Sequence, residues 1–70
     1  MQYNSIGTNI RKFRTEKKLR QEDLAERAGL SANYIGMVER GEKIPSLESF
    51  ISIVNALGVS CLLYTSDAAD

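Results

Sequence analysis

The sequence contains no histidine and no tryptophan, and its single cysteine is Cys61. Without histidine, the chain cannot build a Cys/His zinc site, a Ser–His or Cys–His nucleophile, or a histidine-ligated haem. A single cysteine also excludes an intramolecular disulfide, so apolar burial must hold the fold, as is usual in a reducing compartment. We therefore expect no enzyme activity, no cofactor and no bound metal.

Long apolar runs are also missing. No stretch approaches the ~20 apolar residues of a membrane-spanning helix, and the first residues lack the basic and apolar segments of a signal peptide. We therefore expect a cytoplasmic protein that does not contact membranes. The 70 residues, 43% hydrophobic and 26% charged, are typical of one small globular domain.

The formal net charge is zero, but the two signs are separated along the chain. Residues 1–20 include six basic residues and one acidic residue, whereas residues 21–60 include three basic and six acidic residues. A basic segment can bind phosphates even in a neutral protein, because charges are screened beyond ~8–10 Å at physiological salt. A solvated helix face would give the same pattern, so charge alone leaves nucleic-acid binding open.

Apolar spacing and helix-end residues predict an all-α fold with four helices and no strand. The expected helices cover residues 5–18, 21–28, 32–40 and 46–57, within a domain over residues 5–60. Gly29, Gly41 and Gly58 are placed to end the last three, and Ser31 and Ser46 to cap the starts of two. The buried face of the fourth helix is expected to consist of Leu47, Phe50, Ile51, Val54 and Leu57.

Residues 21–40 form two predicted helices joined by a three-residue turn, which is a helix-turn-helix. In the second helix Ile35 and Val38 are expected to face the core. The opposite face would carry Asn33, Gly36, Met37 and Arg40. Such a face can enter the major groove of DNA, where Asn33 can pair with adenine. Short helix pairs also occur in proteins that do not bind DNA, so this spacing alone does not decide the function.

Several short strings between residues 6 and 60 occur in a characteristic order and spacing. They are Ile6-Gly7-x-x-Ile10-Arg11, Leu19-x-Gln21-Glu22-Asp23-Leu24-Ala25, Gly29-Leu30-Ser31, Tyr34-Ile35, Glu39-Arg40-Gly41, Pro45-Ser46-Leu47 and Ala56-Leu57-Gly58-Val59-Ser60. Together they resemble the Cro/XRE-like, phage-repressor-type family of helix-turn-helix domains. The resemblance implies a compact four- to five-helix, lambda-repressor-like domain. It also implies binding of double-stranded DNA as a homodimer and regulation of transcription, most often repression.

The same resemblance implies roles for individual side chains. The positions expected at base edges are Ala32, Asn33, Gly36 and Met37. The positions expected at the DNA backbone are Gln21, Arg20, Ser31, Arg40, Lys43 and Arg11. The family also pairs the arginine that matches Arg14 with the glutamate that matches Glu39, so these two residues are expected to form a structural ion pair rather than to bind DNA.

Two residues depart from the family pattern. Arg20 stands where the family commonly has Ser or Thr as a helix cap, so we expect the capping box with Asp23 to be lost at a cost of ~1 kcal/mol, in exchange for a cation near phosphate. Gly36 lies inside a predicted helix, where Gly costs ~1 kcal/mol relative to Ala. Close approach to DNA would explain this glycine, and drift at an exposed site would explain it equally well.

A protein-interaction module, such as the antitoxin of a toxin–antitoxin pair, is the alternative function. A positive surface around Gln21, Asn33 and Arg40 would indicate DNA binding, and an apolar surface there would indicate protein docking.

The last ten residues, 61–70, resemble the translation of a transposase-based sequencing-library adapter. A genuine polar tail is the alternative. On the first interpretation the natural gene is cut at Ser60, and the tail carries no evolved function. Leu62 and Leu63 would then imitate a short fifth helix by chance, and dimer contacts of a longer native protein would be missing.

Overall fold

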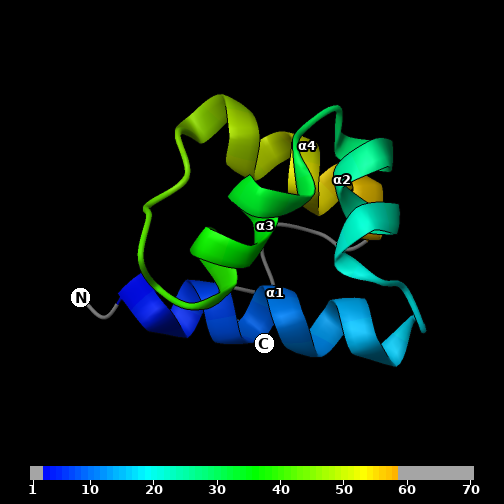
Figure 1. Cartoon of the computed structure of the whole chain (residues 1–70), viewed down its shortest axis with the longest axis horizontal. Coiled ribbons are helices and arrows are strands. Elements are labelled where there is room, and N and C mark those ends of the chain that lie inside the picture. The colour runs from blue at the N-terminus through cyan, green and yellow to red at the C-terminus, as the bar shows by residue number, and fades with distance from the viewer. Residues whose placement is uncertain (1–2, 59–70) are drawn as a thin grey trace, which may run out of the picture.

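The computed structural model describes residues 3–58, with side chains from residue 5 onward. This part of the chain forms four helices and no strand: α1 (Tyr3–Glu16), α2 (Gln21–Ala28), α3 (Ala32–Glu39) and α4 (Leu47–Leu57). Figure 1 shows α1 along one edge of the molecule, with α2, α3 and α4 on the same side of it. The expected all-α fold is confirmed. The expected tail over residues 61–70, with its fifth helix, lies outside the described residues.

The turn between α2 and α3 is built from two local devices. Gly29 adopts the left-handed conformation at φ 72°, and the backbone N–H of Leu30 donates to the Ala25 carbonyl at 2.8 Å, which closes the end of α2. Ser31 then caps α3, since its hydroxyl oxygen accepts a hydrogen bond from the Tyr34 backbone N–H at 3.0 Å. Both helix ends therefore have the positions that their sequence predicts.

The first helix ends two residues earlier than expected, at Glu16 instead of Lys18. Lys18 takes the left-handed conformation at φ 58°, and the backbone N–H of Leu19 donates to the Arg14 carbonyl at 3.1 Å. A non-glycine residue is disfavoured in this conformation by roughly 1–2 kcal/mol. Because no glycine stands at this position, the sequence does not mark the end of the helix here. Tertiary contacts of the chain that follows must supply the compensation.

The core lies where the four helices meet. Its fully buried side chains are Ile10, Leu24, Ile35, Val38, Ile53 and Leu57. The expected buried face of α4 was partly wrong, because Leu47 and Ile51 are 74% and 48% exposed whereas Ile53 is fully buried. Apolar residues occur on more than one side of α4, and the contacts with α2 and α1 select the side that becomes buried.

Two further properties of the described residues concern membranes and metals. No helix within residues 3–58 combines the length and apolar character needed to cross a bilayer. The same residues contain no cluster of three or more His, Cys, Asp or Glu side chains placed to hold a metal ion.

Gly7 marks the place where α1 crosses the end of α3. A Cβ at this position would overlap the Val38 carbonyl oxygen and lie 2.7 Å from that of Glu39. Both atoms belong to the backbone, so they cannot move aside as a flexible side chain would. The absence of a side chain at Gly7 therefore sets the distance between the two helices.

We expect Gly7→Ala to lower the free energy of unfolding by about 1–3 kcal/mol, the usual cost of overpacking, although Ala is the better helix former. Urea denaturation followed by circular dichroism measures the change. Thr8→Ala, at the exposed neighbouring position, is the control and should change stability by less than about 0.5 kcal/mol. A Gly7→Ala variant as stable as the parent would contradict the close approach.

Candidate nucleic-acid interface

An ion pair between α1 and α3 lies at the centre of the candidate site. Arg14 Nε donates to Glu39 Oε2 at 2.6 Å and Arg14 Nη2 donates to Oε1 at 3.0 Å. The two side chains are 11% and 3% exposed. Arg14 Nη1 also donates to the Leu19 carbonyl at 2.8 Å. The expected pairing of Arg14 with Glu39 is present, and it also holds the loop that leads into α2.

Gln21, the first residue of α2, extends this network toward the surface. Its side-chain amide donates from Nε2 to Glu39 Oε1 at 3.1 Å. The Glu39 carboxylate thus accepts from both Arg14 and Gln21, which satisfies a nearly buried anion. The amide oxygen of Gln21 stays outside this contact, next to α3.

An open cavity of about 300 Å³ lies beside this network. Its lining consists of Arg11, Arg14, Gln21, Glu39 and Arg40. Three residues expected at the DNA backbone, Arg11, Gln21 and Arg40, are therefore brought together from α1, α2 and the end of α3. The lining holds three arginines and one glutamate, so the cavity stays net positive even though Arg14 is paired with Glu39 and Arg40 with Glu42.

Gly36 does not have the position that the sequence predicts. It is buried, so the expectation of an exposed glycine on the outer face of the helix is wrong. A Cβ at Gly36 would lie 3.0 Å from Arg40 Nη1 and 3.4 Å from Gln21 Oε1. The side chains of Arg40 and Gln21 therefore cover it, and a base contact at Gly36 stays a prediction that requires Arg40 to move.

The other residues expected at base edges lie on the same helix. Asn33 is exposed, whereas Ala32 and Met37 are half-buried, and Ala32 also packs against the core. Ser31, expected at the DNA backbone, uses its hydroxyl oxygen to cap α3, although its O–H group still has a proton to donate. Asn33 is thus the most accessible polar side chain for a base edge, and these roles stay predictions.

Arg20 and Lys43, both expected at phosphates, differ in their surroundings. The Arg20 guanidinium pairs with Glu22 and Asp23, each at 3.2 Å. Its hydrogen bonds to Asp23 lower the pKa of that carboxyl and raise the pKa of Arg20. Lys43 is exposed and forms no ion pair with any residue that the structure describes. Lys43 is therefore the freer of the two cations.

The expected loss of the capping box at Arg20 is half correct. A guanidinium has no acceptor, so Arg20 cannot cap the α2 N–H groups as Ser or Thr would. Asp23 nevertheless supplies its half, because its Oδ2 accepts from the Arg20 backbone N–H at 2.9 Å. The same carboxylate also binds the guanidinium, which offsets part of the missing cap.

Glu42 is a residue of this site that the sequence did not indicate. Arg40 Nε donates to Glu42 Oε2 at 2.8 Å, and Arg40 Nη2 donates to Oε1 at 3.3 Å. These hydrogen bonds lower the pKa of Glu42 and raise the pKa of Arg40. Residues two apart do not meet on a helix. The one available signal was Gly41 between them, because a glycine that ends a helix turns the chain back.

Comparisons with known proteins agree with this geometry. The chain matches the family described as Helix-turn-helix over residues 10–63. An HTH-type transcriptional regulator of Sinorhizobium fredii, y4dJ, is 38% identical over 55 residues, covering 79% of this chain and 71% of the relative. The immunity repressor protein of Bacillus phage phi105 is 40% identical over 55 residues, covering 79% of this chain. This chain spans only 38% of the length of that repressor.

One solved structure is similar to this chain over most of the length of both proteins. The restriction-modification controller protein C.AhdI from Aeromonas hydrophila is 40% identical and gives a TM-score of 0.77. The match covers 79% of this chain and 83% of the controller protein. The similarity therefore includes the arrangement of the helices and is not confined to short motifs.

Arg14→Ala should lower the free energy of unfolding by about 3 kcal/mol, because it leaves the nearly buried Glu39 carboxylate without its charged partner. Chemical denaturation at low temperature measures the change. Arg14→Lys keeps the charge but loses the fork geometry, so it should fall between Arg14→Ala and the parent. Arg11→Ala, at an exposed position, should change stability by less than about 0.5 kcal/mol. Unchanged stability in Arg14→Ala would contradict the structural role of the pair.

Gly36→Ala should raise the free energy of unfolding by about 0.5–1 kcal/mol, since Ala is the better helix former. The added methyl meets only the flexible ends of Arg40 and Gln21, in contrast to the backbone atoms beside Gly7. Thermal denaturation distinguishes the outcomes. A lower melting temperature would mean that the two covering side chains cannot give way.

Proposed function

The chain belongs to the helix-turn-helix family of DNA-binding transcriptional regulators, and we propose that it reads DNA with α3 in the major groove and the cavity beside α3 against the DNA backbone. The observation that carries this proposal is the positive cavity lined by Arg11, Gln21 and Arg40. In this arrangement α3 supplies base contacts, and the residues around it supply phosphate contacts.

The charges around the cavity support a phosphate contact. Glu39 and Arg14 neutralise each other, and Gln21 is anchored on Glu39 with its amide at the cavity wall. Arg11 then supplies an unpaired positive charge toward a bound phosphate, and Arg40 supplies a second one once it leaves Glu42. Contacts of this kind hold the protein on the duplex and carry no sequence information.

Sequence reading is assigned to the exposed end of α3. Asn33 lies in its first turn, where the N-terminal residues of a recognition helix meet base edges. Its amide can pair with N6 and N7 of adenine. Ala32 and Met37 supply apolar surface for a thymine methyl group, and Gly36 becomes accessible only when Arg40 is displaced.

A protein-docking function at this surface has less support. The cavity is lined by charged and amide side chains, whereas docking would require an apolar surface. The large exposed apolar side chains of the described residues are Ile44, Leu47 and Ile51, and none of them lines the cavity. We include a homodimer in the proposal because these three side chains offer apolar surface that does not compete with DNA.

We also propose that the protein represses transcription and that it acts in the cytoplasm. A repressor acts by occupying its operator and needs no chemistry, which suits a chain without histidine. The similarity to a phage immunity repressor supports this direction of regulation.

Selection of the 70-residue chain against a random duplex library tests the proposal. We expect enrichment of a short sequence and binding that weakens as salt rises. An inverted repeat with half-sites about one helical turn apart would support the homodimer, and a lone half-site would remove it from the proposal. No enrichment and no salt-sensitive binding by a folded chain would overturn DNA binding at this site.

Variants at Asn33 and Lys43 separate the two kinds of contact. Asn33→Ala should cost about 1–3 kcal/mol on the selected sequence and relax the preference at one base position. Lys43→Ala should weaken binding to all sequences alike and reduce the salt slope by about 1. Fluorescence anisotropy on selected and random duplexes measures both. Equal losses on the two duplexes for Asn33→Ala would contradict its assigned role.

A further inference from the structure

Arg40, which the proposed function places at a DNA phosphate, already holds an anion in the free protein. Its Nε and Nη2 atoms donate to the two carboxylate oxygens of Glu42 at 2.8 and 3.3 Å. Arginine binds phosphate oxygens with the same two-pronged geometry. We propose that Glu42 occupies the phosphate-binding edge of Arg40 until DNA displaces it, and so sets the affinity and salt dependence of binding. This inference rests on the proposed function.

The backbone holds Glu42 close to Arg40. Gly41 adopts the left-handed conformation at φ 77°, its N–H donates to the Val38 carbonyl at 3.1 Å, and the Glu42 N–H donates to the Met37 carbonyl at 2.9 Å. This is the hydrogen-bond pattern of a Schellman motif, which reverses the chain at the end of α3. This reversal places the backbone of Glu42 beside the last turn of α3, from where its side chain reaches Arg40.

The exposure of the pair lets a DNA phosphate compete with Glu42. Both side chains are 55% exposed, so water and salt weaken their attraction, and exposed pairs of this kind contribute little to stability. By contrast, Arg14 and Glu39 are nearly buried and stay together. Of the two arginine–glutamate pairs at the end of α3, only Arg40–Glu42 is placed to exchange its partner.

The same pair controls access to α3. While Nε and Nη2 of Arg40 bind Glu42, its Nη1 atom lies 3.0 Å from the position that a Cβ on Gly36 would take. Release of Arg40 toward a phosphate would remove the nearer of the two side chains that cover Gly36, leaving Gln21 beside it. Glu42 is thus a positioning residue: it acts on DNA binding through Arg40 and not by contact with DNA.

The test compares Glu42→Gln with the parent on random-sequence duplexes and on the selected duplex. In Glu42→Gln, DNA no longer has to break the exposed ion pair with Arg40. The affinity for both duplexes should therefore rise about two- to fivefold. The slope of log affinity against log salt concentration should become steeper by up to about 0.9. In the parent, the carboxylate that DNA displaces takes up a cation, and in Glu42→Gln this uptake is absent. A purely structural role for Glu42 would leave that slope unchanged. Thermal denaturation verifies that each variant is folded.

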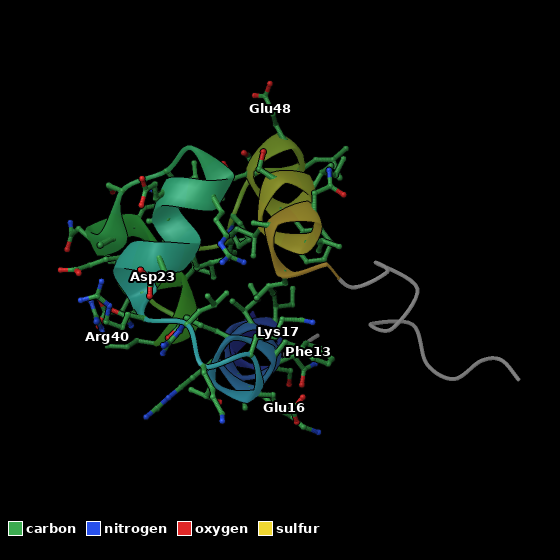
Figure 2. All side chains as sticks on the ribbon, turned by 90° about the vertical axis from the view of Figure 1, so that its right-hand side faces the viewer. Phe13, Glu16, Lys17, Asp23, Arg40 and Glu48 are labelled. Atoms are coloured by element: carbon green, nitrogen blue, oxygen red, sulfur yellow. The ribbon has the colours of Figure 1, made fainter. Side chains whose placement is uncertain are left out.

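Two further variants decide whether Glu42 acts through Arg40. In an Arg40→Ala background the Glu42→Gln gain should disappear. Glu48→Gln removes the same charge at the start of α4, and Figure 2 shows Glu48 pointing outward, well away from Arg40. Glu48→Gln should leave the affinity within about 1.5-fold of the parent, below the gain expected from an exposed pair.

Two results would overturn the inference while leaving the proposed function intact. One is an unchanged or weakened affinity of Glu42→Gln, and the other is a gain of the same size in the Arg40→Ala background or in Glu48→Gln. Either would mean that Glu42 does not compete for Arg40. If the folded parent bound no DNA at all, the proposed function would fail first, and this inference with it.

Discussion

The pairing of Arg14 with Glu39 is the interaction on which the rest of the structure depends. It joins the last turn of α1 to the last residue of α3 and also reaches the carbonyl of Leu19, where the chain turns into α2. Gln21 uses the same carboxylate. One nearly buried anion therefore sets the relative positions of three helices, and the cavity proposed to receive a phosphate lies directly beside it. Stability and the geometry of DNA binding consequently share a single contact.

Two glycines allow close approach in this small domain, but their physical roles differ. Gly7 faces backbone oxygens of α3, which cannot move without changing the position of the helix. Gly36 lies beneath the ends of Arg40 and Gln21, which can rotate away. The first glycine is thus a constraint on the fold, while the second leaves a space whose cover can change when a ligand binds. The distinction rests on whether the neighbouring atoms belong to backbone or to flexible side chains.

A protein of zero net charge binds a polyanion only through locally unpaired cations. In the described part of the chain, Arg14, Arg20 and Arg40 are all paired with carboxylates, and Arg11 and Lys43 are not. The pairs at Arg20 and Arg40 are exposed and weak, so a phosphate can replace the carboxylate. The effective charge of the surface therefore depends on which pairs open, and a count of residues alone does not provide it.

The sequence by itself determined the four helices, the turn at Gly29, the caps at Ser31 and Ser46, and the family, because these depend on local spacing and on residues adjacent in the chain. Only the tertiary structure decided that α1 ends before Lys18, that Ile53 and not Ile51 is buried, and that Gly36 is covered. It also paired Arg40 with Glu42. Each of these depends on atoms that different helices or a reversal of the chain bring together, and the periodicity of one helix contains no information about them.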